Sequence, residues 1–337
     1  MHARHVKYRT TLLRRLMVAT ALLASSWVMP AMAADPVAAT AAANGPACTA
    51  ARPFYWEIGD VGGPVVSGQV GGTLYNRNSR MNLASASKWP LGAYVLQKSG
   101  GSPSPAVRDA SLMLAGYKSF NQALCVLAPT VNGCFNMLGN NVQVPGLVGD
   151  FFYSGGNSQY LAASPALLNL GSFTTAQLTA EMQITLGTTM EYQYPALPAG
   201  MEGSAAEYAD FLIRLMKPPA SGGLVMHGHL GVDTVPTLPC PAGHSGCSAG
   251  GSLEWSYGHH YWVEDNAVPG QFNAGGPVIG PGDGAYSSAG AWGFYPWISA
   301  DKSLYGIVAR RGLLGTAFRA SAICGQAIRY AYTGYTP

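Results

Sequence analysis

Hydrophobic and polar positions divide the chain into strand-forming ends and a helical middle. β-Forming residues occupy positions 54–58 and 65–70, on either side of a glycine- and proline-containing turn at 62–64. Strand-like patterns return near the other end, at residues 255–264, 284–298 and 303–310, before a helical pattern over residues 317–332. The two ends of the chain are therefore expected to build one sheet.

Helical spacing of apolar residues dominates the middle of the chain. A helix is expected to open at Ser85 and to end at Gly100-Gly101. Amphipathic segments follow at residues 105–115, 175–183 and 204–216. We expect an α/β (α+β) fold, in which an antiparallel sheet flanked by terminal helices lies beside a mainly helical lobe, with a cleft between them. The sheet lobe would span about 48–100 and 250–337, and the helical lobe about 101–249.

The first 33 residues have the pattern of a secretory signal peptide. Five basic and no acidic residues precede a short apolar run at 16–28, and Ala31-Met32-Ala33 supplies small residues before Ala34. We expect export to the periplasm or the medium, with no stable membrane anchor after cleavage, since no cysteine lies at the cleavage site. Residues 34–47 are rich in alanine and are expected to form a flexible lead-in to a domain at 48–337.

Loss of the signal segment changes the charge balance of the protein. The full chain has 19 basic and 16 acidic residues, and five of the basic residues lie in the signal, which leaves 14 basic and 16 acidic. This balance gives no reason to expect a nucleic-acid partner. Only 10% of the residues are charged, and the 43 glycines and 23 prolines are typical of a loop-rich extracytoplasmic protein.

Six cysteines in an exported chain indicate disulfides, although six cysteines allow 15 connectivities. Two pairs are close in sequence, Cys125 with Cys134 and Cys240 with Cys247. They leave Cys48 with Cys324, which would join the start of the domain to its last helix. A zinc site is disfavoured because no two cysteines have C-x-x-C spacing.

Ser85 and Lys88 are the candidate nucleophile and proton acceptor. Residues three apart on a helix share one face, so the lysine can accept the serine proton if burial lowers its pKa. The same S-x-x-K pattern occurs at Ser299–Lys302. That second copy falls between two expected strands and is interpreted as a solvated turn, whereas Ser85 follows a strand pair and opens a helix.

Three motifs resemble those of the penicillin-recognising serine hydrolases, the family of β-lactamases, penicillin-binding proteins and related esterases. Leu83–Lys88 is similar to the first motif, Tyr153-Ser154-Gly155 to the second, and Ser288-Ala289-Gly290 to the third. The resemblance extends over about 52–333, including Gly203–Leu215, Tyr257-Gly258 and Trp262–Glu264. It implies a β-lactamase/transpeptidase-like fold and no metal or other cofactor.

The resemblance also implies roles for individual residues. Ser85 would carry the acyl group, and Lys88 and Tyr153 would share the proton transfers. The backbone N–H groups of Ser85 and Ala291 would form the oxyanion hole, where such a donor contributes about 3 kcal/mol. Substrate contacts are expected from Gly155, Ser288, Gly290 and Trp292.

Two residues depart from the usual motifs of that family. Gly155 stands where asparagine is common, and Ser288 stands where lysine or histidine is usual. Without the cation, a substrate carboxylate would be costly to desolvate. The sequence therefore favours a neutral ester or amide as the substrate.

Two groups of residues have a second interpretation. Trp292, Phe294, Tyr295 and Trp297 could line an acyl pocket or belong to the core of the sheet. The histidines at 227, 229, 259 and 260 could suggest a metal site, but no acidic residue falls in a recognised metal-binding spacing.

The leading hypothesis is an exported serine acyl hydrolase that acts on a small ester, amide or peptide-like molecule. A D-amino-acid peptidase or β-lactamase is the alternative within enzymes. A non-catalytic sensor or binding protein that keeps the fold is the alternative from another class.

Overall fold

The computed structural model describes residues 34–237, 255–265, 282–313, 315 and 317–336. The expected signal peptide at 1–33 lies outside these residues, as do Cys240 and Cys247. In the part of the chain that is described, no helix has both the length and the apolar character needed to cross a bilayer.

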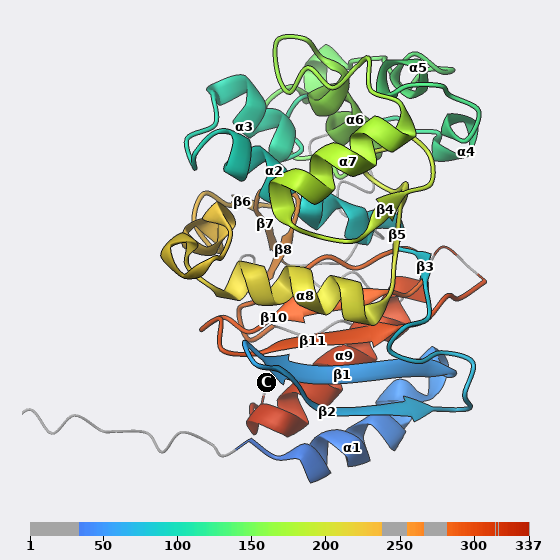
Figure 1. Ribbon diagram of the computed structural model, residues 1–337, viewed down its shortest axis with the longest axis vertical. Coiled ribbons are helices and arrows are strands. Elements are labelled where there is room, and N and C mark those ends of the chain that lie inside the picture. The colour runs from blue at the N-terminus through green and yellow to red at the C-terminus, as the bar shows by residue number, and fades with distance from the viewer. Residues whose placement is uncertain (1–33, 238–254, 266–281, 314, 316, 337) are drawn as a thin grey trace, which may run out of the picture. The chain divides into compact units, whose positions relative to one another are not determined.

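The central feature of the described residues is an antiparallel sheet, assembled from both ends of the chain (Figure 1). Its strands lie in the order β2 (Gly63–Val70), β1 (Phe54–Asp60), β11 (Tyr305–Ala309), β10 (Tyr295–Ile298), β9 (Ala285–Ser287), β8 (Trp262–Glu264), β7 (Ser256–Tyr257) and β6 (Val235–Pro236). β1 pairs directly with β11, with Tyr55 opposite Ala309. The expected joining of the two chain ends in one sheet is confirmed, but the strands expected at 255–264 and 284–298 are each divided into two short ones.

Helices cover both faces of this sheet. On β11, Ile307 and Ala309 pack with α8 (Ala205–Met216), whereas Val308 packs with α9 (Ala317–Thr333). Successive side chains of a strand point to opposite faces, so α8 and α9 lie on opposite sides. The capping box expected in α8 is present, since Ser204 and Glu207 each accept a hydrogen bond from the other's backbone N–H.

The flexible lead-in expected at 34–47 is wrong. These residues form α1 (Pro36–Asn44), which contacts α9, and the 3₁₀-helix η1 (Pro46–Ala51) follows. Asp35 caps α1 by accepting hydrogen bonds from Val37 N and Ala38 N, both at 2.9 Å. Ala39 and Ala43 are fully buried, because alanine lets a helix approach its neighbour closely. The alanine-rich composition therefore reflects close packing.

The helical part of the molecule lies between β2 and β6 in sequence. Its helices are α2 (Lys88–Lys98), α3 (Pro105–Ser111), α4 (Gln122–Cys125), α5 (Val131–Phe135), α6 (Gly155–Ala163) and α7 (Thr175–Leu186). A second small sheet, not expected from the sequence, joins β3 (Met81–Asn82), β5 (Met201–Gly203) and β4 (Glu191–Tyr192). Short 3₁₀ segments are η2 (Ala84–Ser87), η3 (Pro145–Leu147), η4 (Pro219–Ser221) and η5 (Val225–His229). The expected helical lobe at 101–249 needs correction, because α8 packs on the large sheet and β6 is one of its strands.

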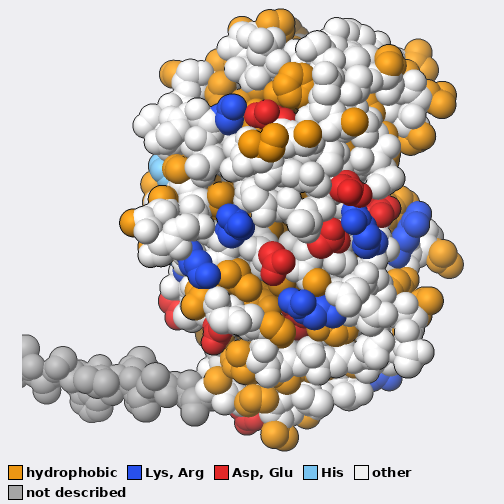
Figure 2. All heavy atoms as spheres, in the orientation of Figure 1, with side chains coloured by type: hydrophobic (Ala, Val, Ile, Leu, Met, Phe, Trp, Pro, Cys, Tyr) orange, Lys and Arg blue, Asp and Glu red, His pale blue; other side chains and the backbone are white. Residues whose placement is uncertain are grey.

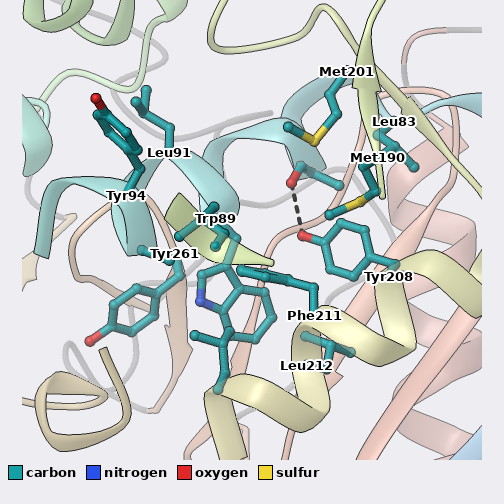
Figure 3. Close-up of a cluster of buried hydrophobic side chains, with 14 of the residues drawn as sticks. Leu83, Trp89, Leu91, Tyr94, Met190, Met201, Tyr208, Phe211, Leu212 and Tyr261 are labelled. Atoms are coloured by element: carbon teal, nitrogen blue, oxygen red, sulfur yellow. Dashed lines mark hydrogen bonds between the residues drawn. The ribbon is translucent and has the colours of Figure 1, made fainter. Parts of the chain in front are cut away.

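Helix α2 lies at the centre of the largest apolar cluster (Figure 3). Trp89 is fully buried and contacts Phe211 edge-on, with 6.5 Å between ring centroids, and stacks on Tyr261 at 6.1 Å. These contacts fix the first turn of α2 between α8 and the turn that joins β7 and β8.

On the face that Figure 2 shows, charged side chains are few and the two signs are largely intermixed. Arg80 illustrates this arrangement, because it forms ion pairs with Glu191, Glu202 and Glu207 at 3.0–3.4 Å. Such exposed pairs contribute little to stability, so the apolar clusters account for most of it.

Two of the three expected disulfides lie within the described residues, and both are formed. Cys48 is bonded to Cys324, and Cys125 to Cys134. The first joins η1 to α9 across a sequence separation of 276 residues, whereas the second spans nine. The third expected pair, Cys240 with Cys247, lies outside the described residues.

We expect the Cys48→Ser/Cys324→Ser variant to lose about 2–5 kcal/mol of unfolding free energy, since it frees a long loop in the unfolded state. The Cys125→Ser/Cys134→Ser variant is the matched control and should lose less, because its loop is short. Urea unfolding followed by tryptophan fluorescence measures both values. Equal losses in the two variants would contradict this ranking.

Candidate active site

Ser85 lies in a tight turn immediately before α2. The sequence suggested that an α-helix opens at Ser85, but η2 comes first and α2 begins at Lys88. Ala84 has a left-handed backbone with φ of 46°, which is uncommon for a residue with a Cβ atom. Asn82 Oδ1 accepts a hydrogen bond from Ala84 N at 2.9 Å and stabilises this conformation. Such strain is often concentrated at functional sites.

Neighbouring elements hold the Ser85 turn by hydrogen bonds to its backbone and to Ser87. Leu83 N donates to Met201 O at 2.9 Å, and Met201 N donates to Ser87 Oγ at 3.2 Å. The Tyr208 hydroxyl on α8 donates to Ala86 O at 2.8 Å, as Figure 3 shows. Strand β5 and helix α8 therefore fix the position of Ser85.

Lys88 is buried and its amine faces Ser85. Only 3% of the residue is exposed, and Lys88 Nζ donates to Ser85 Oγ at 2.9 Å and to Pro198 O at 3.2 Å. No carboxylate among the described residues forms an ion pair with this amine. Burial without a counter-ion disfavours the ammonium form and lowers the pKa of Lys88 to about 7. Near neutral pH, a large fraction of the amine is therefore free to accept a proton.

Tyr153 lies beside the same amine. Lys88 Nζ is 4.8 Å from the centroid of the Tyr153 ring, and that ring packs against Trp262 with 5.0 Å between centroids. Burial raises the pKa of Tyr153 to about 12, although interactions of the phenol with Ser85 and Trp262 oppose the shift. The phenol is therefore protonated at neutral pH and is a proton donor there.

The structure gives a physical reason for the glycine at position 155. A Cβ atom on Gly155 would lie 2.5 Å from Phe120 Cδ1 and 3.0 Å from Pro198 Cγ, so a larger residue would displace both. The same Pro198 supplies the carbonyl that accepts a hydrogen bond from Lys88. Position 155 therefore supplies no side chain to the site. The Lys88 amine is bound instead by the backbone oxygen of Pro198. Pro198 could not be predicted from the sequence, because a backbone acceptor leaves no signature in residue types.

The expected third motif lies against the Ser85 turn. Ser288 is 2% exposed, and its hydroxyl donates to the backbone carbonyl of Ser85 at 3.2 Å. A Cβ atom on Gly290 would lie 2.2 Å from Leu83 O, so only glycine allows this close approach. The N–H of the next residue, Ala291, donates to no acceptor among the described residues. The loop thus brings an unused donor close to the Ser85 turn.

The four aromatic residues after this motif have different environments. Phe294, Tyr295 and Trp297 are buried in the core, as one of the two interpretations expected. Trp292 is only partly buried and lines a surface hollow with Arg311. An acyl pocket built from all four residues is therefore excluded.

The second S-x-x-K sequence lies in the turn between β10 and β11, as expected. Lys302 Nζ donates to His227 O at 2.8 Å, and Ser299 Oγ donates to Asp301 at 2.6 Å. Ser299 and Lys302 therefore each bind another partner.

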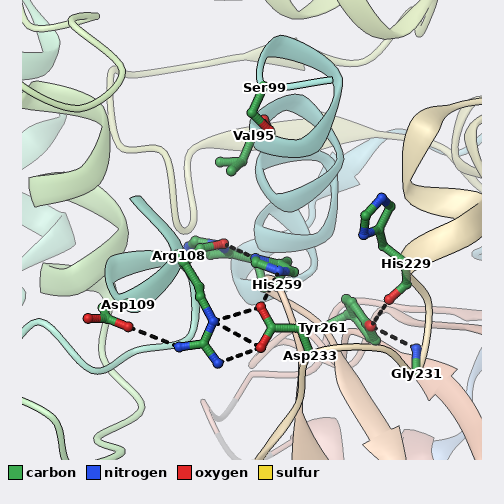
Figure 4. Close-up of polar contacts among 11 residues, drawn as sticks. Val95, Ser99, Arg108, Asp109, His229, Gly231, Asp233, His259 and Tyr261 are labelled. Carbon is green, nitrogen blue, oxygen red and sulfur yellow. Dashed lines mark hydrogen bonds and ion pairs between the residues drawn. The ribbon is translucent and has the colours of Figure 1, made fainter. Parts of the chain in front are cut away.

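His259 and His260 belong to one polar network, and Figure 4 shows Arg108, Asp233 and His259 of it. Arg108 pairs with Asp233, and Asp233 Oδ2 lies 3.2 Å from His259 Nε2. Ser111 Oγ lies 3.0 Å from His259 Nδ1 and 3.2 Å from His260 Nδ1. Burial lowers the pKa of His259 to about 4 and that of His260 well below its ordinary value, so both rings are neutral. This network ties the turn between β7 and β8 to α3.

His227 and His229, two of the histidines considered for a metal site, lie in η5 and contact neighbouring segments. His227 Nδ1 lies 3.0 Å from Leu215 O, and the backbone carbonyl of His229 accepts a hydrogen bond from Tyr261. Within the described ranges, no three histidine, cysteine or acidic side chains are grouped as metal ligands.

Comparison by sequence finds no matching protein-family model and no matching curated protein. Comparison by structure finds solved proteins that share most of this chain's length. A candidate β-lactamase from Bacteroides dorei DSM 17855 has a TM-score of 0.56 at 16% identity, covering 84% of this chain and 93% of that one.

Two further solved structures are similar to this chain over most of its length. EstCE1, named as a hydrolase with promiscuous acyltransferase activity, has a TM-score of 0.54 at 14% identity, with 88% of this chain and 98% of that one covered. Simvastatin synthase (LovD) from Aspergillus terreus has a TM-score of 0.53 at 14% identity, with 90% and 100% covered. The chain therefore has the β-lactamase/transpeptidase-like fold, as the sequence motifs suggested.

Proposed function

We propose that this protein is an exported serine hydrolase that cleaves a neutral ester or amide through an acyl-enzyme on Ser85. The observation that carries the proposal is the buried Lys88 amine, 2.9 Å from Ser85 Oγ, with its pKa lowered to about 7. A neutral amine at that distance can take the hydroxyl proton, which is the activation that a serine nucleophile requires.

In the first step, Ser85 Oγ attacks the substrate carbonyl and its proton passes to Lys88 Nζ. A C–O bond forms, and the carbonyl oxygen becomes an oxyanion. The N–H groups of Ser85 and Ala291 are the donors proposed to stabilise that charge. The Ala291 N–H is suited to this role because no described residue already accepts its hydrogen bond.

In the second step, the bond to the leaving group breaks and the leaving oxygen or nitrogen needs a proton. Tyr153 is the proposed donor, since burial raises its pKa to about 12 and its ring lies beside Lys88. The Lys88 ammonium then returns a proton to the phenol. Water then attacks the carbonyl of the acyl-enzyme and gives up a proton to the same pair of groups. The bond to Ser85 Oγ breaks, that oxygen takes the proton back, and the acid product leaves.

A neutral substrate fits the third motif better than an anionic one. Ser288 directs its hydroxyl to the backbone of Ser85 and brings no positive charge. A β-lactam or a peptide with a free carboxylate would lack a cationic partner at this position. The names of two proteins with the same fold, a hydrolase with acyltransferase activity and a candidate β-lactamase, support acyl transfer without selecting the substrate.

Export is part of the proposal and rests on the N-terminal sequence pattern and on the disulfides. Two disulfides are formed among the described residues, and disulfides persist in oxidising compartments.

We expect Ser85→Ala to lower turnover of p-nitrophenyl esters roughly a thousandfold or more, because the acyl-enzyme cannot form. Ser299→Ala is the matched control, since it removes the serine of the other S-x-x-K sequence, and should keep full activity. A serine-reactive phosphonate, with mass spectrometry of the labelled peptide, locates the nucleophile independently.

Retained turnover in Ser85→Ala would rule out this mechanism. Stable labelling by a fluorescent penicillin, or hydrolysis of nitrocefin in preference to esters, would favour the peptidase or β-lactamase alternative. Failure to turn over any ester, amide or lactam, with specific ligand binding retained, would favour the sensor alternative.

The pH dependence provides a separate check on Lys88. The active form of this residue is the neutral amine, so kcat/KM should rise with pH through about 7 and then level off. Tyr153→Phe should lower the plateau without moving this rise, because the phenol is not titrated in that range. A rise centred below pH 5, the range of carboxylates, would assign the base to another group.

A further inference from the structure

A pocket lined by three arginines lies at the surface near the end of β11. Arg52 comes from the segment before β1, and Arg310 and Arg311 follow β11 directly. We call this the arginine pocket, and its volume is about 800 Å³. Small-molecule sites usually have volumes of about 300–1,000 Å³.

The positive charges of the pocket have no acidic partner. None of the three arginines forms an ion pair with a carboxylate among the described residues, and no acidic residue lines the pocket. Arg52 donates to Asn44 O at 2.6 Å, and Arg310 Nη1 donates to Ala50 O at 3.1 Å. Each guanidinium has five N–H donors, which is more than these bonds to described residues use.

Arg310 is the least exposed of the three arginines. It is half-buried, and burial lowers its pKa from the ordinary value. A partly buried cation with no described counter-ion loses some of its hydration, and an incoming anion would offset that loss.

The remaining walls of the pocket are largely apolar. Leu74, Ala317 and Ala320 line it, and Leu313 lies at its rim with 98% of its surface exposed. A pocket with apolar walls and a few charged groups suits a molecule with a charged head and an apolar body.

The pocket is connected to the candidate active site through one hydrogen bond. Gly312 N, in the pocket wall, donates to Trp292 O at 2.6 Å. Trp292 directly follows Ala291, the proposed oxyanion donor. Trp292 also lines a smaller hollow together with Arg311, Gly312 and Leu313, which belong to the pocket wall as well.

From charge and shape together, we infer that the arginine pocket binds an anionic amphiphile, a single carboxylate carried on an apolar chain. The carboxylate pairs with Arg310 and Arg311, and the chain lies along Leu74 and Ala320. The inference concerns binding, and it stands whether or not Ser85 is a nucleophile.

Isothermal titration calorimetry of the mature protein tests the site with three probes that share an eight-carbon chain. Octanoate should bind at one site per chain. The affinity for 1-octanol should be lower by about tenfold or more, and octyltrimethylammonium should not bind. Arg311→Gln should weaken octanoate binding about tenfold, because an exposed arginine is lost without disturbing the fold. Leu74→Gln should weaken octanoate binding and leave the weaker binding of acetate unchanged.

Arg80→Gln is the matched control, because it also removes one surface arginine but does not line the pocket. Thermal unfolding confirms that each variant is folded. Equal affinities for octanoate and octanol, or equal effects of Arg311→Gln and Arg80→Gln, would overturn the inference. So would the absence of octanoate binding up to millimolar concentration.

Discussion

The proposed chemistry depends on one unfavourable arrangement, an amine buried beside a hydroxyl with no described carboxylate paired to it. In water, lysine holds its proton far too tightly to act as a base at neutral pH. Burial of Lys88 reverses that preference, while Pro198 O and Ser85 Oγ satisfy its hydrogen bonds without adding negative charge. A glutamate at hydrogen-bonding distance would stabilise the ammonium and abolish the base. The neutral surroundings of Lys88 are therefore as important as the lysine itself.

The scaffold maintains this arrangement through backbone contacts from distant segments. Met201 on β5 and Tyr208 on α8 bind the Ser85 turn, and the Gly290 loop approaches it so closely that a side chain there would collide with Leu83 O. Each contact crosses more than 100 residues of sequence. Local helix propensity alone would not place Ala84 in a left-handed conformation, so tertiary packing determines the geometry of the nucleophile.

The sequence predicted the parts of the site that depend on residue type. A serine and a lysine three apart, followed by a tyrosine and a glycine-containing loop, identified the groups that the fold brings together. It did not predict Pro198, because a carbonyl oxygen belongs to every residue and only the fold selects one. It also failed for residues 34–47, where small alanines suggested a flexible segment but instead allow α1 to pack closely on α9. The composition of residues 34–47 gives the size of their side chains, but it does not identify α9 as the helix that packs against them.

The pairing of β1 with β11 has a consequence for biosynthesis. β1 pairs at once with β2, which follows it in the chain, but its other neighbour, β11, comes only some 250 residues later, and Cys48 must wait longer for Cys324. Topologies dominated by such distant contacts fold slowly, because the closure of a large loop precedes the contacts that stabilise it. A ribosome-bound or truncated chain that ends before β11 already carries Ser85, Lys88 and Tyr153, yet it lacks the central sheet that supports them. If Ser85 is the nucleophile as proposed, its reactivity is therefore expected only after β11 and α9 have been made and the central sheet has formed.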